Sequence, residues 1–235
     1  MSSKKYKGKQ CVYCVEATAT TADHVIGRNF FLVNRRADLP QVPACESCNR
    51  KKSELENYLM PVLGFGGRHP DASVNLQTMI LKRLNKNARL KAHLEAGFTK
   101  SGGTTIPFDH IPFNKLFAMI AQGLLWYHWQ TLLGHGYSAI AATFSDAGAA
   151  FFEQMVAKLE TPNRVVRNLG ENTFSYQGVQ GTNCPQVTIW RFSMYGGVIF
   201  MGDPKLPGPA SLVVAVTGRD AIIRKLLMAP AEIRR

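Results

Sequence analysis

The stretches Cys11-Val-Tyr-Cys14 and Cys45-Glu-Ser-Cys48-Asn49 decide the fold of this chain. Each Cys-x-x-Cys pair has the spacing of a tight knuckle that presents two thiolates to one metal, and four thiolates suit tetrahedral Zn²⁺. A simple zinc ribbon places about 15–20 residues between its pairs, whereas 30 residues separate the two pairs here. The longer insert contains Asp23-His24, so we expect the zinc to scaffold a second site.

Composition and charge favour a folded protein with a polyanionic partner. Of 235 residues, 46% are hydrophobic and 19% are charged, which is enough to bury a core and unlike a disordered chain. The formal net charge is +12, and the first hundred residues carry +9 of it. We expect nucleic acid as the partner ahead of an anionic membrane. A general solubility charge is the plainer alternative.

The remaining cysteine and the uncharged segment indicate a cytoplasmic location. Five cysteines are present, and Cys184 alone falls outside the two pairs. Metal-type spacing with one odd cysteine favours a reducing compartment over a disulfide framework, and residues 1–10 are basic, without an apolar signal region. The stretch Leu116–Ser145 has no formal charge, but glutamines, histidines and glycines interrupt it. It therefore predicts a buried amphipathic helix, with no membrane span.

The hydrophobic pattern predicts an α+β fold in three parts. Residues 1–10 form a basic arm, residues 11–66 form the zinc module, and residues 70–235 form a helical and sheet-containing domain whose role the sequence does not give. A glycine-rich linker, Gly64–Pro70, separates the last two parts. Helices are expected over residues 49–63, 71–96, 112–133 and 145–159. A β-hairpin or short strands are expected over 18–26, a strand pair over 98–108, and single strands over 173–177, 187–193, 197–201 and 211–216.

The residues within the zinc bracket suit phosphodiester hydrolysis. That reaction needs a base for water, a cation against the developing charge and a fixed geometry. An imidazole titrates near pH 6.5, so His24 can serve as the base. Asp23 and Asn49 can supply oxygen ligands to Mg²⁺ or Mn²⁺, which keeps several waters. Because Asn49 directly follows Cys48, the structural zinc would set the position of a catalytic group.

At these residues the chain resembles the HNH endonucleases with a ββα-metal fold and a four-cysteine zinc site. The matching text is Cys11-Val-Tyr-Cys14, Thr21-Ala-Asp-His-Val25 and Val42-Pro-Ala-Cys-Glu-Ser-Cys-Asn-Arg-Lys-Lys52. The resemblance covers about a quarter of the chain. It implies that His24 activates water and that Asp23 and Asn49 bind one divalent cation. The remaining 70–235 region is similar to parts of small bacterial or phage proteins of that kind.

The chain departs from the family pattern at the middle residue of the H-N-H motif, which is an asparagine. The family often has an asparagine a few residues before the third cysteine, where it orients the histidine. Pro40 stands at that place here, and proline has no side chain that can hold an imidazole. Gln41, Asp38 or a backbone carbonyl are the candidates to replace it.

Three hypotheses for function stay open. The first is a metal-dependent endonuclease that acts on DNA, with Arg28, Arg50, Lys51 and Lys52 as phosphate contacts. The second is a zinc module that binds nucleic acid without cutting it, in which Asn49 serves only as a helix cap. The third is a nuclease effector whose C-terminal region senses a protein or ligand partner. The sequence does not give DNA or RNA preference, sequence specificity, or whether a homodimer supplies a second active site for double-strand cleavage.

Overall fold

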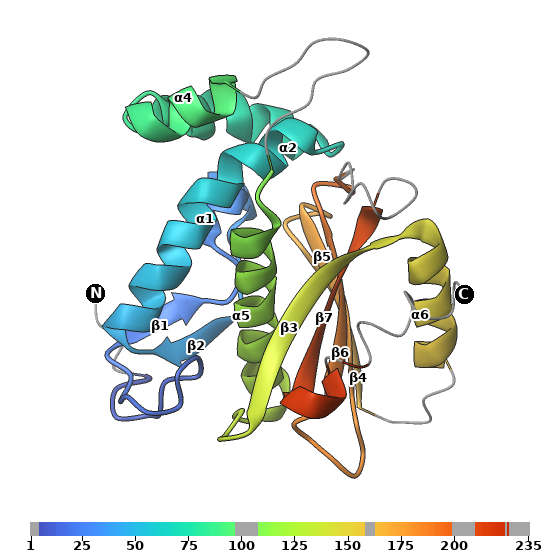
Figure 1. Cartoon of the computed structure of the whole chain (residues 1–235). Helices are drawn as coiled ribbons and strands as arrows, with labels where there is room; N and C mark the ends of the chain where they lie inside the picture. Colours follow the sequence, from blue (N-terminus) through green and yellow to red (C-terminus); the bar gives the residue numbers. More distant parts are fainter. Residues whose placement is uncertain (1–4, 97–107, 158–162, 199–209, 224, 226–235) are drawn as a thin grey trace.

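The computed structural model describes residues 5–96, 108–157, 163–198, 210–223 and 225, and it has the predicted α+β class (Figure 1). Short 3₁₀ turns occupy Arg28–Phe30 and Val33–Arg35, and a π-helical turn occupies Leu76–Ile80. The α-helices are α1 (Glu46–Gly66), α2 (Pro70–Asn75), α3 (Leu81–Leu84), α4 (Ala88–Ala96), α5 (His110–Trp129) and α6 (Asp146–Ala157). The strands are β1 (Thr21–His24), β2 (Gln41–Ala44), β3 (Tyr137–Ser145), β4 (Arg164–Leu169), β5 (Phe174–Gln180), β6 (Thr188–Met194) and β7 (Ala210–Arg219).

The N-terminal unit is an antiparallel pair of strands followed directly by a long helix. Thr21 lies opposite Ala44 and His24 lies opposite Gln41. Cys45 caps α1, because its sulfur accepts a hydrogen bond from the Cys48 N–H at 3.5 Å. The helix therefore begins three residues earlier than the pattern predicts, at Glu46, and it ends at Gly66. This arrangement joins the second cysteine pair rigidly to the strand pair.

The C-terminal part is a five-stranded antiparallel sheet between two helical layers. The strand order is β3-β7-β6-β5-β4. Helix α5 lies between this sheet and the N-terminal unit, and α6 covers part of the opposite face (Figure 1). The Asp109 side chain caps α5 by accepting a hydrogen bond from the Ile111 N–H at 2.9 Å. Within the described part of the chain, no helix is long and apolar enough to cross a membrane.

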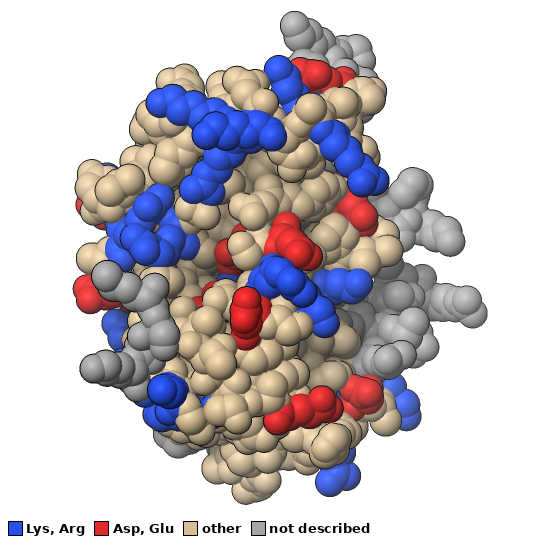
Figure 2. Space-filling view, turned by 90° about the vertical axis from the view of Figure 1, so that its left-hand side faces the viewer, with Lys and Arg blue, Asp and Glu red and all other residues tan. Residues whose placement is uncertain are grey.

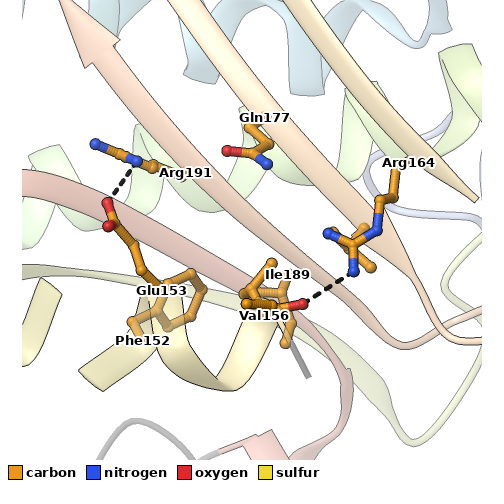
Figure 3. A pocket seen from close by; sticks show the side chains of 9 residues that line it. Phe152, Glu153, Val156, Arg164, Gln177, Ile189 and Arg191 are labelled. Carbon is orange, nitrogen blue, oxygen red and sulfur yellow. Dashed lines mark hydrogen bonds and ion pairs between the residues drawn. The ribbon is translucent and has the colours of Figure 1, made fainter. Parts of the chain in front are cut away.

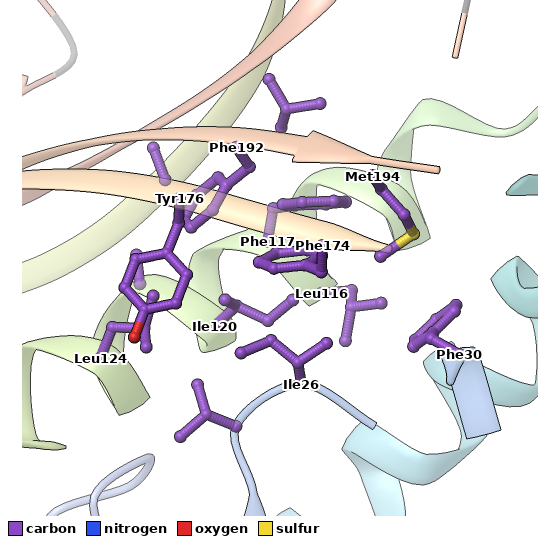
Figure 4. Packing of buried hydrophobic residues seen from close by; sticks show 14 of the residues in the cluster. Ile26, Phe30, Leu116, Phe117, Ile120, Leu124, Phe174, Tyr176, Phe192 and Met194 are labelled. Atoms are coloured by element: carbon purple, nitrogen blue, oxygen red, sulfur yellow. The ribbon is translucent and has the colours of Figure 1, made fainter. Parts of the chain in front are cut away.

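One hydrophobic core joins the N-terminal unit to the sheet. Ile26 and Phe30, from the loop after β1, lie against the same cluster as α5 and the sheet (Figure 4). The rings of Phe117 and Phe192 lie 5.3 Å apart between centroids, so α5 packs directly on β6. The fully buried aromatic members of this core are Phe30, Phe31, Phe113, Phe117, Phe174, Trp190, Phe192 and Tyr195. The two predicted parts, 11–66 and 70–235, thus bury apolar surface against each other.

The predicted linker Gly64–Pro70 is packed, because the glycines permit close approach. A Cβ on Gly67 would lie 2.6 Å from side-chain atoms of both Ala72 and Tyr195. The N–H groups of Arg68 and His69 both donate to the Tyr195 carbonyl at 2.7 Å. The glycine-rich composition therefore reflects a tight junction with the C-terminal part.

Several predicted elements differ in the structure. The single helix expected over residues 71–96 is divided into α2, a π-helical turn, α3 and α4. Strands β2, β3 and β4 are absent from the prediction, and the hairpin or short strands expected over 18–26 form only β1, which pairs with β2. Strands β5, β6 and β7 match three predicted strands. The strand pair expected at 98–108 lies almost wholly outside the described residues, as does much of the strand expected at 197–201.

Candidate functional site

The four paired cysteines form one cluster in the N-terminal unit, at the start of α1. The sulfur atoms of Cys11, Cys14, Cys45 and Cys48 all lie within 4.8 Å of one another, and Cys14 Sγ is 4.0 Å from Cys45 Sγ. Tetrahedral zinc with Zn–S bonds of about 2.3 Å requires sulfurs separated by about 3.8 Å. The donor set therefore fits a metal such as zinc.

The pKa shifts of the clustered thiols differ in direction. Burial, together with the negative charge of neighbouring thiolates, raises the pKa of Cys48 well above its ordinary value. Burial opposes ionisation of Cys14 too, but N–H donors from Ala17 and Glu16 outweigh it and lower the pKa of that thiol to about 7. Four thiolates at this spacing repel one another, and a divalent cation removes that cost.

His24 lies at the end of β1 beside a glutamine from β2. Its Nε2 is 2.8 Å from Gln41 Nε2, across the strand pair. Of the three replacements expected for the missing asparagine, Gln41 is the one that contacts the imidazole. Because the two ends of an amide are interchangeable by rotation, the Gln41 oxygen can accept from Nε2–H and leave the Nδ1 lone pair available.

Asp23 points to the other side of β1, into a buried ionic cluster. Its Oδ2 accepts a hydrogen bond from Tyr13 Oη at 2.5 Å and lies 3.1 Å from Lys52 Nζ. The Lys52 ammonium also pairs with Glu56 and donates to the His24 carbonyl oxygen at 2.7 Å. Lys52 is 0% exposed and Asp23 is 7% exposed. One lysine of α1 therefore holds the last two residues of β1.

The buried cluster corrects one prediction and adds two residues. Since Lys52 has no exposed surface, its ammonium cannot serve as the surface phosphate contact that was expected. Glu56 reaches the cluster because residue 27 is glycine, and a Cβ there would lie 2.5 Å from the Glu56 carboxylate. Tyr13 and Glu56 were missed, because neither belongs to a recognisable spacing.

Asn49 is attached to the start of β1. Its Nδ2 donates to Thr21 Oγ1 at 3.1 Å, and Thr21 Oγ1 in turn donates to the Ala44 carbonyl at 3.0 Å. This leaves the amide oxygen of Asn49 as the group that can bind a cation. In this structure the two predicted cation ligands are thus held by different partners, Asn49 by Thr21 and Asp23 by Tyr13 and Lys52.

The electrostatic surroundings keep His24 neutral at pH 7. Burial and then the positive charge of Arg28 lower its pKa, and Lys52 acts in the same direction, whereas Asp23 opposes them. A neutral imidazole is the form that accepts a proton. Arg28, Arg50 and Lys51 are exposed, as a phosphate contact requires.

A separate hollow lies on the far side of the sheet, between α6 and strands β4–β6 (Figure 3). It has a volume of about 240 Å³. Arg191 pairs with Glu153 at 2.5 Å, and Arg164 Nη2 donates to the Val156 carbonyl at 3.0 Å. Its remaining lining is largely apolar, without a metal-ligating cluster among the described residues, and we assign it no chemistry.

Comparison with known protein families, with curated proteins and with solved structures finds no match to this chain.

Proposed function

We propose that this chain is a metal-dependent endonuclease of the HNH type, which hydrolyses phosphodiester bonds in DNA. The observation that carries the proposal is the β1–β2–α1 unit, in which one helix contacts both ends of β1. Asn49 donates to Thr21 and Lys52 donates to the His24 carbonyl. The cysteine cluster anchors the same helix at Cys45 and Cys48.

In the proposed mechanism, His24 takes the proton from the attacking water. Gln41 holds Nε2, so Nδ1 is the atom that accepts this proton. The lowered pKa keeps the imidazole unprotonated at pH 7. Arg28, exposed and close enough to affect His24, supplies positive charge to the scissile phosphate.

The oxygen ligands present suit a hard divalent cation. The Asn49 amide oxygen would be one protein ligand in this proposal. Asp23, whose Oδ2 is held by Lys52 and Tyr13 on the side of β1 away from His24, would contribute Oδ1 only after its side chain turns toward Asn49. Mg²⁺ or Mn²⁺ bound there would stabilise the charge that develops on the phosphate.

One observation favours a second candidate, a nucleic-acid-binding module without catalysis. The ammonium of Lys52 already neutralises Asp23, so a chain that never binds a catalytic cation would also have a stable site. The two candidates differ in cation dependence. Only the nuclease needs Mg²⁺ or Mn²⁺.

Supercoiled plasmid incubated with the zinc-loaded full-length protein tests the proposal. We expect nicking with Mg²⁺ or Mn²⁺ and none with EDTA. Asn49→Ala should need a higher cation concentration for half-maximal cutting, whereas Asn183→Ala, at an exposed asparagine between β5 and β6, should behave like wild type. Plasmid binding without cation-dependent cutting would support the binding module instead.

A further inference from the structure

Two arginines lie on the loop that follows His24 and β1. Arg28 is exposed, and Arg36 lies further along this loop, with its Nε donating to the Phe31 carbonyl at 3.2 Å. Arg36 Nη2 is 3.4 Å from Met79 Sδ, which places this guanidinium beside the segment that leads into α3. Burial, and then the positive charges of Arg28 and Arg83, lower the pKa of Arg36. Three guanidinium groups therefore lie close enough to repel one another.

Arg83 connects this group to α3. Its Nη2 donates to Asn29 Oδ1 at 2.9 Å, from the residue directly after Arg28. Arg83 and Lys86 are both exposed, and both line a hollow of about 280 Å³ between α1 and α3. The cations near His24 and the cations of α3 thus belong to one stretch of surface.

A second hollow, of about 510 Å³, extends this surface along α1. It is lined by Arg89 and His93 from α4 and by residues of α1 that include Asn57. Asn57, Asn87 and Leu90 line both hollows, so the two form one continuous groove. On this side of the molecule most lysine and arginine side chains gather in the upper half of the view (Figure 2).

We propose that this surface, the basic track formed by Arg28, Arg36, Arg83, Lys86 and Arg89, holds the phosphate backbone of duplex DNA next to the catalytic site. The inference rests on the proposed function and extends it to the substrate-binding surface. It assigns α3 and α4, which lie outside the zinc unit, to DNA binding.

The dimensions suit a duplex. Asn49 and Asn57 are eight residues apart on α1, a distance of about 12 Å at 1.5 Å per residue. Duplex DNA advances about 3.4 Å per base pair, so the groove begins some three to four base pairs from the proposed scissile phosphate. Besides burial, the groups that lower the pKa of Arg36 are the cations Arg28 and Arg83, and one carboxylate, Glu54, lines the second hollow with Arg89. Guanidinium groups are frequent partners of phosphate oxygens.

The test is the salt dependence of binding to a 20-base-pair duplex in EDTA, where no cutting occurs. Each lost phosphate contact lowers the slope of log K against log salt by about 0.9. For Arg83→Gln/Lys86→Gln we expect a slope smaller by about 1.8 and binding on the order of ten-fold weaker at 0.1 M salt. The matched control, Lys115→Gln/Arg219→Gln, removes two exposed cations from α5 and β7 and should bind like wild type.

A charge-retaining variant separates binding from folding. Arg83→Lys/Lys86→Arg should keep the wild-type slope, although it changes both side chains. Two results would contradict the proposed basic track. The first is that the glutamine variant binds DNA as tightly as the control variant. The second is that the charge-retaining variant loses as much affinity as the glutamine variant. Tighter binding of single-stranded RNA than of duplex DNA by wild type would also overturn it.

The same variants distinguish this inference from the proposed nuclease activity. With Mg²⁺, the glutamine variant should raise KM for duplex cleavage and leave kcat unchanged, because His24 and Asn49 are intact. Track-dependent binding without any cutting would remove the nuclease proposal and leave the track standing. Cutting with an unchanged KM would remove the track and leave the nuclease.

Discussion

Lys52 is the residue on which the geometry of β1 depends most. It is fully buried and bonds to Asp23, Glu56 and the His24 carbonyl. Burial alone would lower its pKa, but Glu56 and Asp23 outweigh burial and raise it, so the lysine stays charged. A buried cation with two carboxylates is stable only as a complete set.

We predict that Lys52→Met destabilises the protein by about 3–5 kcal/mol, because two buried carboxylates lose their counter-charge. Lys51→Met, at the exposed neighbouring position, should change stability by less than about 0.5 kcal/mol. Urea unfolding of the zinc-loaded proteins measures both. Equal stability of the two variants would show that Lys52 is not paired in the interior.

His128, in α5 and away from the cysteine cluster, gives a pH-dependent prediction. Burial, and then the charge of Arg167, lower the pKa of His128 to about 4, and its Nε2 is 2.9 Å from Tyr176 Oη. The pKa of His128 in the folded state lies below its unfolded value near 6.5. The neutral His128 side chain therefore contributes its full share of the free energy of unfolding above pH 6.5, and this share is lost as the pH falls toward 4. Allowing for partial exposure, we expect a loss of about 1–2 kcal/mol. His128→Gln should remove this component from stability measured between pH 7 and 4.5; an unchanged pH profile would contradict the assignment.

At the residue scale, the sequence predicted the groups that have a recognisable spacing. The cysteine cluster needs only two Cys-x-x-Cys pairs, and it is present. Tyr13 and Glu56 could not be found, because their role depends on how β1 and α1 pack. Lys52 was placed on the surface because it adjoins Arg50 and Lys51, but α1 turns it inward.

At the scale of elements, the cysteine cluster fixes the start of α1 relative to β1 and β2. Cys45 both caps the helix and belongs to the cluster. We predict that Cys45→Ser loses zinc and unfolds the N-terminal unit, since a four-thiolate site contributes on the order of 10 kcal/mol. Cys184→Ser, outside the cluster, should keep one zinc per chain. Metal analysis and circular dichroism give the answer, and wild-type protein purified natively without any bound metal would contradict it.

Periodicity predicted the helices better than the strands. The apolar stripe of α5 and the apolar face of α1 are strong signals, and both helices are present. Strand β3, with three alanines, lacks an alternating pattern because residues from both of its faces are buried, Ala141 and Phe144 among them. Strand β4 lies at the sheet edge and is mostly exposed, so its sequence has no alternating apolar pattern that would predict a strand.

At the scale of the whole molecule, Tyr195 joins the N-terminal unit to the sheet. Its hydroxyl donates to the Phe30 carbonyl at 2.6 Å and accepts from Asn75 at 3.0 Å. We predict that Tyr195→Phe costs about 1–3 kcal/mol, because buried polar partners are left unsatisfied. The control is Tyr137→Phe. Among the described residues, the Tyr137 hydroxyl accepts a hydrogen bond only from the exposed Arg219, so its loss should cost less than about 0.5 kcal/mol. Thermal unfolding compares them, and equal midpoints would argue against this junction.

The shared core could not be read from the sequence. Gly64–Pro70 has linker composition, and only the packing of Gly67 against Tyr195 shows that it is a junction. The N-terminal unit with its cysteine cluster is thus part of a larger body, in which α5 packs against both α1 and β2. Catalytic activity should therefore be measured with the whole chain and not with the N-terminal unit alone.

The most direct test is the single-turnover rate of DNA cleavage by the full-length protein and by His24→Ala, with saturating Mg²⁺ and with duplex binding measured on the same samples. Loss of a general base costs about 10²- to 10⁴-fold. We predict a loss of that size with unchanged binding and unchanged zinc content. Cleavage by His24→Ala at the wild-type rate, or no cleavage by a zinc-loaded wild-type protein that binds DNA, would contradict the central claim.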